Sequence, residues 1–164
     1  MKQISLILIS SLLLTVFACS ESKKKPSITP LTFHFKKEGE LTLKKGSNDS
    51  LIAKLDIEFA ETAYETQTGL MHRENMENNR GMLFILKEET QQAFYMKNTE
   101  ISLDIIFLNS AKEIVSFQEN TNPLDETPLP STVPAKYVLE INAGLAKLWQ
   151  LEIGDKAEWV VLNK

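Results

Sequence analysis

The chain has 164 residues, a formal net charge of −4 at pH 7, 43% hydrophobic residues and a single cysteine. This length is enough for one domain with a sizeable core. The mildly acidic balance gives no electrostatic basis for binding nucleic acid, and a lone cysteine excludes an internal disulfide.

The first residues have the three parts of a secretory signal. Lys2 provides a positive start, an apolar run extends from Ile4 to Ala18, and the chain becomes polar directly after Cys19. The run of about 15 residues is shorter than the roughly 20 that span a bilayer as a helix. The stretch Val16–Cys19 resembles the lipobox of bacterial lipoprotein precursors, although Phe17 stands where a small residue is usual. This resemblance implies cleavage before Cys19 and acylation of its thiol and of the new amine.

We therefore predict a signal peptide at residues 1–18, a lipidated Cys19 with a flexible tether at residues 19–30, and one domain at residues 31–164. The expected location is the cell envelope, anchored to a membrane by lipid and facing the periplasm or the exterior. The alternatives are an ordinary cleaved signal with a free cysteine, or a short uncleaved anchor. Lys23–Lys25 either contact anionic headgroups or keep the tether solvated.

Alternation of apolar and polar residues with a period of two predicts half-buried strands in the first part of the domain. These strands are expected at residues 31–36, 41–43 and 51–59, with turns at Glu38–Glu40 and Gly46–Asp49.

Two short helices interrupt this pattern. Residues 61–70 contain good helix formers, with Thr62 as the N-cap and Gly69 at the end. Asn142 is expected to cap a second helix that runs through Leu151.

The remaining segments read as strands and one long loop. The strands are expected at residues 82–86, 93–96, 103–108, 114–119, 137–141 and 157–162. Four prolines between Asn122 and Pro134 predict a long irregular loop. Many short strands, two short helices and no βαβ rhythm predict a mostly β single domain, an antiparallel sandwich or a barrel-like fold.

Several motifs in order resemble a widespread bacterial and archaeal family known as domain of unknown function 192. They are Gly69–Arg73, Gly81–Phe84, Tyr95–Thr99 with Ile101–Phe107, and Tyr137–Glu140 followed by Gly144 and the Ile153–Asp155 turn. The resemblance covers about residues 51–162. It implies a compact, mostly β fold, often behind a signal or lipoprotein leader, and no established activity. Residues 31–48 lie outside it and are expected to form an added hairpin.

The polar members of these motifs are the candidate site residues: Arg73, Lys97, Asn98, Asp104 and Glu140. Asp104 interrupts an apolar strand, and an unpaired buried charge would cost several kcal/mol, so Arg73 or Lys97 is expected to pair with it. We predict that Arg73, Lys97, Asn98 and Asp104 bind a polar ligand in a small pocket. The alternative is an ion pair with a purely structural role.

Asp104 and Glu140 also form a candidate catalytic pair for an envelope hydrolase that acts on a saccharide. A nucleophilic triad is disfavoured because the only histidines are His34 and His72 and no Gly-x-Ser-x-Gly motif is present.

The third alternative is a copper site. The thioethers of Met71, Met82 and Met96 suit Cu(I), and His72 could join them, but methionine also commonly fills gaps in a core. The spacing of the histidines gives no zinc signature.

Our leading prediction is a membrane-anchored envelope lipoprotein with a non-catalytic binding or interaction domain and no cofactor. Its expected partners are the membrane and an unidentified small-molecule, saccharide or protein ligand. Four aromatic residues offer either a stacking platform or core packing: Phe94, Tyr95, Trp149 and Trp159.

Overall fold

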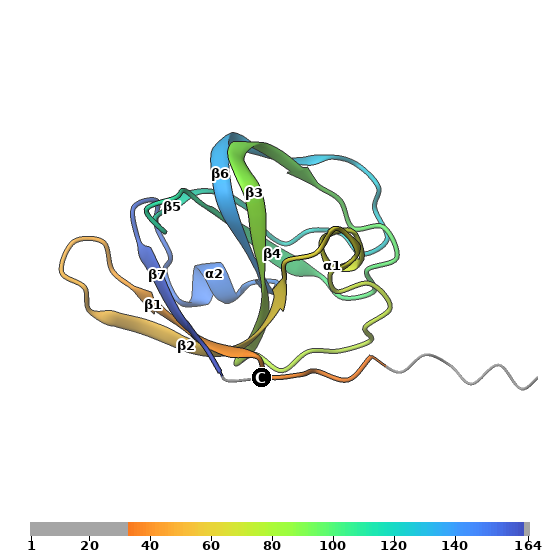
Figure 1. Ribbon diagram of the computed structural model, residues 1–164, viewed down its shortest axis with the longest axis horizontal. Coiled ribbons are helices and arrows are strands. Elements are labelled where there is room, and N and C mark those ends of the chain that lie inside the picture. The colour runs from red at the N-terminus through yellow and green to blue at the C-terminus, as the bar shows by residue number, and fades with distance from the viewer. Residues whose placement is uncertain (1–32, 163–164) are drawn as a thin grey trace, which may run out of the picture. The chain divides into compact units, whose positions relative to one another are not determined.

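The structure is a computed structural model that describes residues 33–162 (Figure 1). The predicted signal peptide at residues 1–18, the lipidation site Cys19 and the tether at residues 19–30 lie outside the described residues. Within the described part, no helix is long and apolar enough to cross a membrane.

Seven strands within residues 33–162 form one sheet in the order β5-β4-β6-β3-β2-β1-β7. The strands are β1 (Gly39–Lys44), β2 (Leu51–Ala60), β3 (Arg80–Phe94), β4 (Leu103–Leu108), β5 (Ile114–Gln118), β6 (Leu129–Asn142) and β7 (Lys156–Val161). Two short helices accompany them, α1 (Ala63–Thr68) and α2 (Leu145–Leu148) (Figure 1). The prediction of a mostly β single domain with two short helices is confirmed.

The sheet is mixed and remains open. β2 and β3 pair in parallel through α1, whereas the other neighbouring strands are antiparallel. The expected antiparallel sandwich or barrel-like fold is therefore corrected to one open, mixed sheet. The parallel pair was not predicted because a crossover helix of only six residues leaves no βαβ rhythm in the sequence. The edge strands β5 and β7 approach each other at one end, where Ile114 N–H donates to the Asp155 carbonyl at 2.8 Å.

The N-terminal strand β1 differs from its prediction. Glu38–Glu40 do not form a turn, because Glu38 N–H already donates to the Ile57 carbonyl and Gly39 begins the strand. A Cβ on Gly39 would lie 2.7 Å from the Phe59 ring, so this glycine permits close packing rather than a reversal. Residues 33–38 are irregular instead of a strand, so residues 33–48 do not form a hairpin of their own. β1 instead pairs with β2 and β7 within the sheet.

The proline-rich segment is only partly a loop. β6 begins at Leu129 and includes Pro130 and Pro134, where its pairing with β3 shifts register. Both prolines are exposed, and Gln92 N–H donates to the Ser131 hydroxyl at 3.0 Å instead of to a ladder carbonyl. Proline is tolerated at such irregular pairings because no N–H is required there.

The prediction was correct for α1 and incorrect for the start of α2. α1 has the expected boundaries, with a capping box in which Thr62 and Glu65 bond each other's backbone N–H and with Gly69 at its end at φ 48°. α2 was predicted incorrectly, since its N-cap is Gly144 and Asn142 is the last residue of β6. The Asn142 side-chain amide instead donates to the Met76 carbonyl at 2.7 Å.

Both faces of the sheet carry core residues. Successive side chains of β4 alternate between two clusters: Leu103, Ile105 and Phe107 belong to one, and Ile106 and Leu108 to the other. Leu145 of α2 packs into the cluster with Ile106, which we call the first face. Leu70, which follows α1, packs into the cluster with Ile105, which we call the second face.

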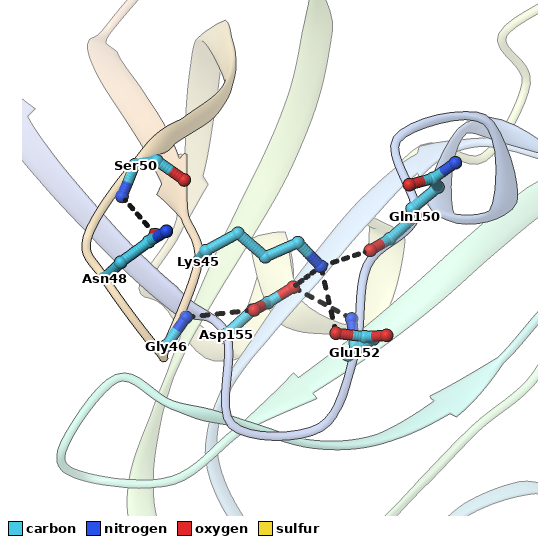
Figure 2. Close-up of polar contacts among 7 residues, drawn as sticks. All are labelled: Lys45, Gly46, Asn48, Ser50, Gln150, Glu152 and Asp155. Carbon is cyan, nitrogen blue, oxygen red and sulfur yellow. Dashed lines mark hydrogen bonds and ion pairs between the residues drawn. The ribbon is translucent and has the colours of Figure 1, made fainter.

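A polar network fastens the β1–β2 turn to the loop before β7 (Figure 2). The buried Asp155 carboxylate accepts hydrogen bonds from the N–H groups of Gly46 at 3.0 Å and Glu152 at 2.9 Å. Lys45 Nζ adds an ion pair with Asp155 at 3.1 Å and a bond to the Gln150 carbonyl at 2.6 Å. Burial opposes ionisation of Asp155, but these bonds outweigh it and lower the pKa of its carboxyl group.

Candidate functional site

Glu140 is a buried acid in the middle of the sheet. On β6 it lies opposite Met82 of β3 and Ile105 of β4, so its side chain is on the second face among apolar residues. Only 5% of the residue is exposed. Among the described residues, no group forms a hydrogen bond or an ion pair with its carboxyl group.

Burial raises the pKa of Glu140 to about 8, while the positive charge of Arg73 acts in the opposite direction. The carboxyl group is therefore mostly protonated at pH 7. A neutral carboxylic acid is able to donate a hydrogen bond, and loss of its proton would place an unpaired negative charge inside the domain.

A cavity of about 150 Å³ opens beside the Glu140 carboxyl group. Gly69 and the end of α1 form one wall, and a Cβ on Gly69 would lie 3.0 Å from the Phe84 ring and 3.8 Å from Glu140 Oε2. β3 provides another wall through Phe84 and Phe94, whose rings meet edge to face with centroids 5.1 Å apart. The remaining lining includes Tyr95 and the polar residues Thr66, Thr68, Gln92 and Thr99.

Arg73 pairs with Glu58 rather than with Asp104. Arg73 Nη1 lies 2.6 Å from Glu58 Oε2, and each side chain is only 9% exposed. This pair lines a second cavity of about 180 Å³ on the other side of Gly69. The predicted partner of Arg73 was therefore wrong, because Glu58 lies on the second face of the sheet with Met82, whereas Asp104 lies on the first face.

Asp104 lies on the first face of the sheet and is fully buried. Its carboxylate accepts hydrogen bonds from the backbone N–H groups of Asn120 at 2.8 Å and Ala146 at 2.9 Å. These bonds tie α2 and the segment after β5 to β4. Asp104 and Glu140 thus point to opposite faces, and the structure does not bring the predicted catalytic pair together.

Lys97 and Asn98 form no side-chain hydrogen bond or ion pair with Arg73 or Asp104 among the described residues. Lys97 is 48% exposed and 3.5 Å from Glu126. Asn98 is exposed with a positive φ of 53°, and its carbonyl accepts the N–H of His72 at 2.8 Å. The structure therefore places Asn98 beside the segment that carries Arg73, while Asp104 lies on the opposite face of the sheet from the Arg73–Glu58 pair.

The proposed copper ligands also differ in their surroundings. Met96 is buried, with its sulfur 3.2 Å from the Thr121 hydroxyl, and Met82 lies in the core of the second face. Met71 borders the Glu140 cavity, whereas His72 stacks on Phe33 with ring centroids 6.0 Å apart. Among residues 33–162, no group of three His, Cys, Asp or Glu side chains is arranged to hold a metal ion.

Comparison with known proteins identifies the family. Residues 43–159 match the family model DUF192, whose description is uncharacterized ACR. The chain belongs to the DUF192 family. This confirms the resemblance seen in the sequence, and the match begins within β1.

DUF192 relatives and structures agree with this assignment. A UPF0127 protein of Thermococcus sibiricus is 32% identical over an alignment that covers 64% of this chain and 66% of that protein. A UPF0127 protein of Pyrococcus abyssi is 33% identical over 63% of this chain and 86% of that protein. The structure of a protein of unknown function from Novosphingobium aromaticivorans superposes with a TM-score of 0.69 and 37% identity, over 73% of this chain and 84% of that one. A Sinorhizobium meliloti protein, described with a proposed role in transcription regulation, has a TM-score of 0.71 and 32% identity, over 77% and 98%.

Sequence reasoning singled out Glu140 but missed its cavity. The available signal was an acid within the apolar stretch Tyr137–Ile141, which marks a buried carboxyl group. The cavity walls come from α1, β3 and the Tyr95–Thr99 turn, and no local pattern predicts that these segments meet at Glu140.

Proposed function

We propose that this DUF192 domain binds a small organic ligand in the Glu140 cavity and performs no chemistry on it. The supporting observation is an acidic residue that is only 5% exposed, whose carboxyl group has no hydrogen-bond or ion-pair partner among the described residues and borders a cavity of about 150 Å³. A buried acid without a partner destabilises a fold, and groups of this kind are concentrated at functional sites.

Binding fits the geometry better than saccharide hydrolysis does. Glycosidases that use acid catalysis place two carboxyl groups on either side of the scissile bond. Asp104 lies on the opposite face of the sheet, and Glu58 is held by Arg73 at 2.6 Å. Of the residues that line the Glu140 cavity, Glu140 is the only acid.

A fragment screen by NMR tests this proposal. Small organic fragments that bind the purified protein should shift the resonances of Phe84, Phe94 and Tyr95. The Glu140→Gln variant should bind them differently, whereas Glu88→Gln, an exposed glutamate of β3, should behave as the parent does. Shifts that cluster elsewhere on the domain, or equal binding by all three proteins, would contradict the assignment of the site.

We also propose that lipid on Cys19 anchors the domain to a membrane of the cell envelope. The support is the sequence alone: a positive start, a short apolar run and the stretch Val16–Cys19. Growth with a labelled palmitate analogue should label the parent and leave Cys19→Ala unlabelled. A Cys19→Ala protein that still fractionates with membranes as the parent does would exclude the lipid as the anchor.

A further inference from the structure

We propose that the ligand of the Glu140 cavity is a small organic cation whose ammonium group pairs with the Glu140 carboxylate. This inference rests on the proposed binding function and adds the charge and size of the ligand.

The distribution of charge around the cavity favours a cation. None of the residues that line the cavity is a lysine, an arginine or a histidine. Arg73 is the charged group that acts on Glu140, but its guanidinium is already paired with Glu58 at 2.6 Å. A bound cation would therefore give Glu140 the partner that the described residues do not supply, whereas an anion would find no cation in the wall.

The rest of the wall also suits an ammonium group. Phe84, Phe94 and Tyr95 present aromatic rings, and ring faces attract organic cations. The hydroxyl groups of Thr66 and Thr68 line the same space and are able to accept ammonium hydrogen bonds.

The volume limits the size of this cation. A cavity of about 150 Å³ is known to hold a molecule as large as benzene. This volume accommodates an ammonium group with a short apolar chain of about four carbons.

Binding should release a proton. At pH 7 the free carboxyl group is mostly protonated because its pKa is about 8, and a bound ammonium group favours the carboxylate. The neutral acid loses H⁺ to solvent, and the carboxylate pairs with the cation. The charged residue that acts on Glu140 is Arg73, which is itself paired with Glu58. β3 and β4 place Met82 and Ile105 opposite Glu140, and neither of these residues titrates. Tyr95 is the other titratable residue of the lining.

Three probes of matched length test the charge of the ligand: butylammonium, 1-butanol and butyrate. NMR titrations should show the tightest binding for butylammonium, with affinity rising about tenfold per pH unit from pH 6 towards pH 8 as expected for release of one proton. Calorimetry in two buffers with different heats of ionisation should show about one proton released per butylammonium bound at pH 6.

Two variants and the alternative outcomes complete the test. Glu140→Gln should lose butylammonium binding and keep that of 1-butanol, and Tyr95→Leu, at a 41% exposed position, should weaken butylammonium more than 1-butanol. Tighter binding of 1-butanol or butyrate to the parent would overturn the cation and leave a binding cavity. Failure of all three probes would overturn both proposals. If Glu140→Gln does not fold, the relative affinities of the three probes for the parent and the proton release on binding still test the charge of the ligand.

Discussion

At the scale of single residues, two acids on neighbouring strands are accommodated in opposite ways. Asp104 and Glu140 both interrupt apolar strands, so the sequence marks them alike. Asp104 receives two backbone N–H groups and acts as a structural link between elements. Glu140 receives none and faces a cavity. The sequence could predict that both acids were unusual, but the difference depends on which backbone amides the fold brings to each.

Replacement of Glu140 by glutamine should change how stability depends on pH. An unfolded glutamate has a pKa of about 4.3, whereas the folded value is about 8, so between these pH values the folded chain holds a proton that the unfolded chain has lost. The free energy of unfolding of the parent should therefore fall with rising pH, by up to about 1.4 kcal/mol per unit, and level off above pH 8. Glu140→Gln should lack this slope and be the more stable protein at pH 9.

Urea denaturation at pH 5, 7 and 9 measures this difference. The exposed control Glu88→Gln should follow the parent. Parallel curves for the parent and Glu140→Gln would mean that the Glu140 carboxyl group is not held in its neutral form by the fold.

Removal of Arg73 should be strongly destabilising. Arg73→Ala leaves Glu58 buried without its partner, and breaking a buried pair in this way costs about 3–5 kcal/mol. Adding Glu58→Gln should restore part of the loss, and Lys97→Ala, which removes an exposed pair, should cost less than about 1 kcal/mol. Denaturation midpoints measure these effects, and an Arg73→Ala loss as small as that of Lys97→Ala would show that the pair is not buried in solution.

At the scale of elements, the sequence predicted those helix and strand boundaries that are set by neighbouring residues. The boundaries of α1 follow from Thr62 and Gly69, and the strand at residues 103–108 follows from its apolar run. The start of β1 could not be predicted because Gly39 serves close packing against the Phe59 ring of β2, a contact that the local sequence does not reveal. The early start of β6 depends on register shifts against β3, which override the usual effect of proline.

The hydrogen bonds and ion pair of Asp155 connect the β1–β2 turn to the loop before β7, which are far apart in sequence. The stability that they contribute should be lost at acidic pH. The pKa of Asp155 is lowered in the folded state, so its contribution is present above the unfolded pKa of about 3.9 and is lost as the pH falls through the folded value. Asp155→Asn should destabilise by about 1.5–3 kcal/mol at pH 7, the range for hydrogen bonds to charged groups.

This difference between the parent and Asp155→Asn should shrink when denaturation is repeated at pH 3. Asp49→Asn is a suitable control because Asp49 is 66% exposed and only pairs with Lys156 at 3.2 Å. An Asp155→Asn protein as stable as Asp49→Asn at pH 7 would contradict a fastening role for the network in Figure 2.

At the scale of the whole molecule, the two faces of the sheet have different roles. The first face holds the core with α2, and its buried acid is fully satisfied by backbone amides. The second face holds a core that is interrupted by Glu140 and its cavity, next to α1. The sequence predicted the fold class and family, but the site depends on a parallel crossover that places Gly69 over Glu140.

The most direct test is a ¹³C NMR titration of the Glu140 carboxyl carbon in the purified protein. A midpoint near pH 8, which moves lower when butylammonium is added, is the expected result for a neutral, unpartnered acid in a ligand cavity. A midpoint near the ordinary value of about 4.3 would show that Glu140 is already ionised and partnered, and would contradict its assignment as the binding group.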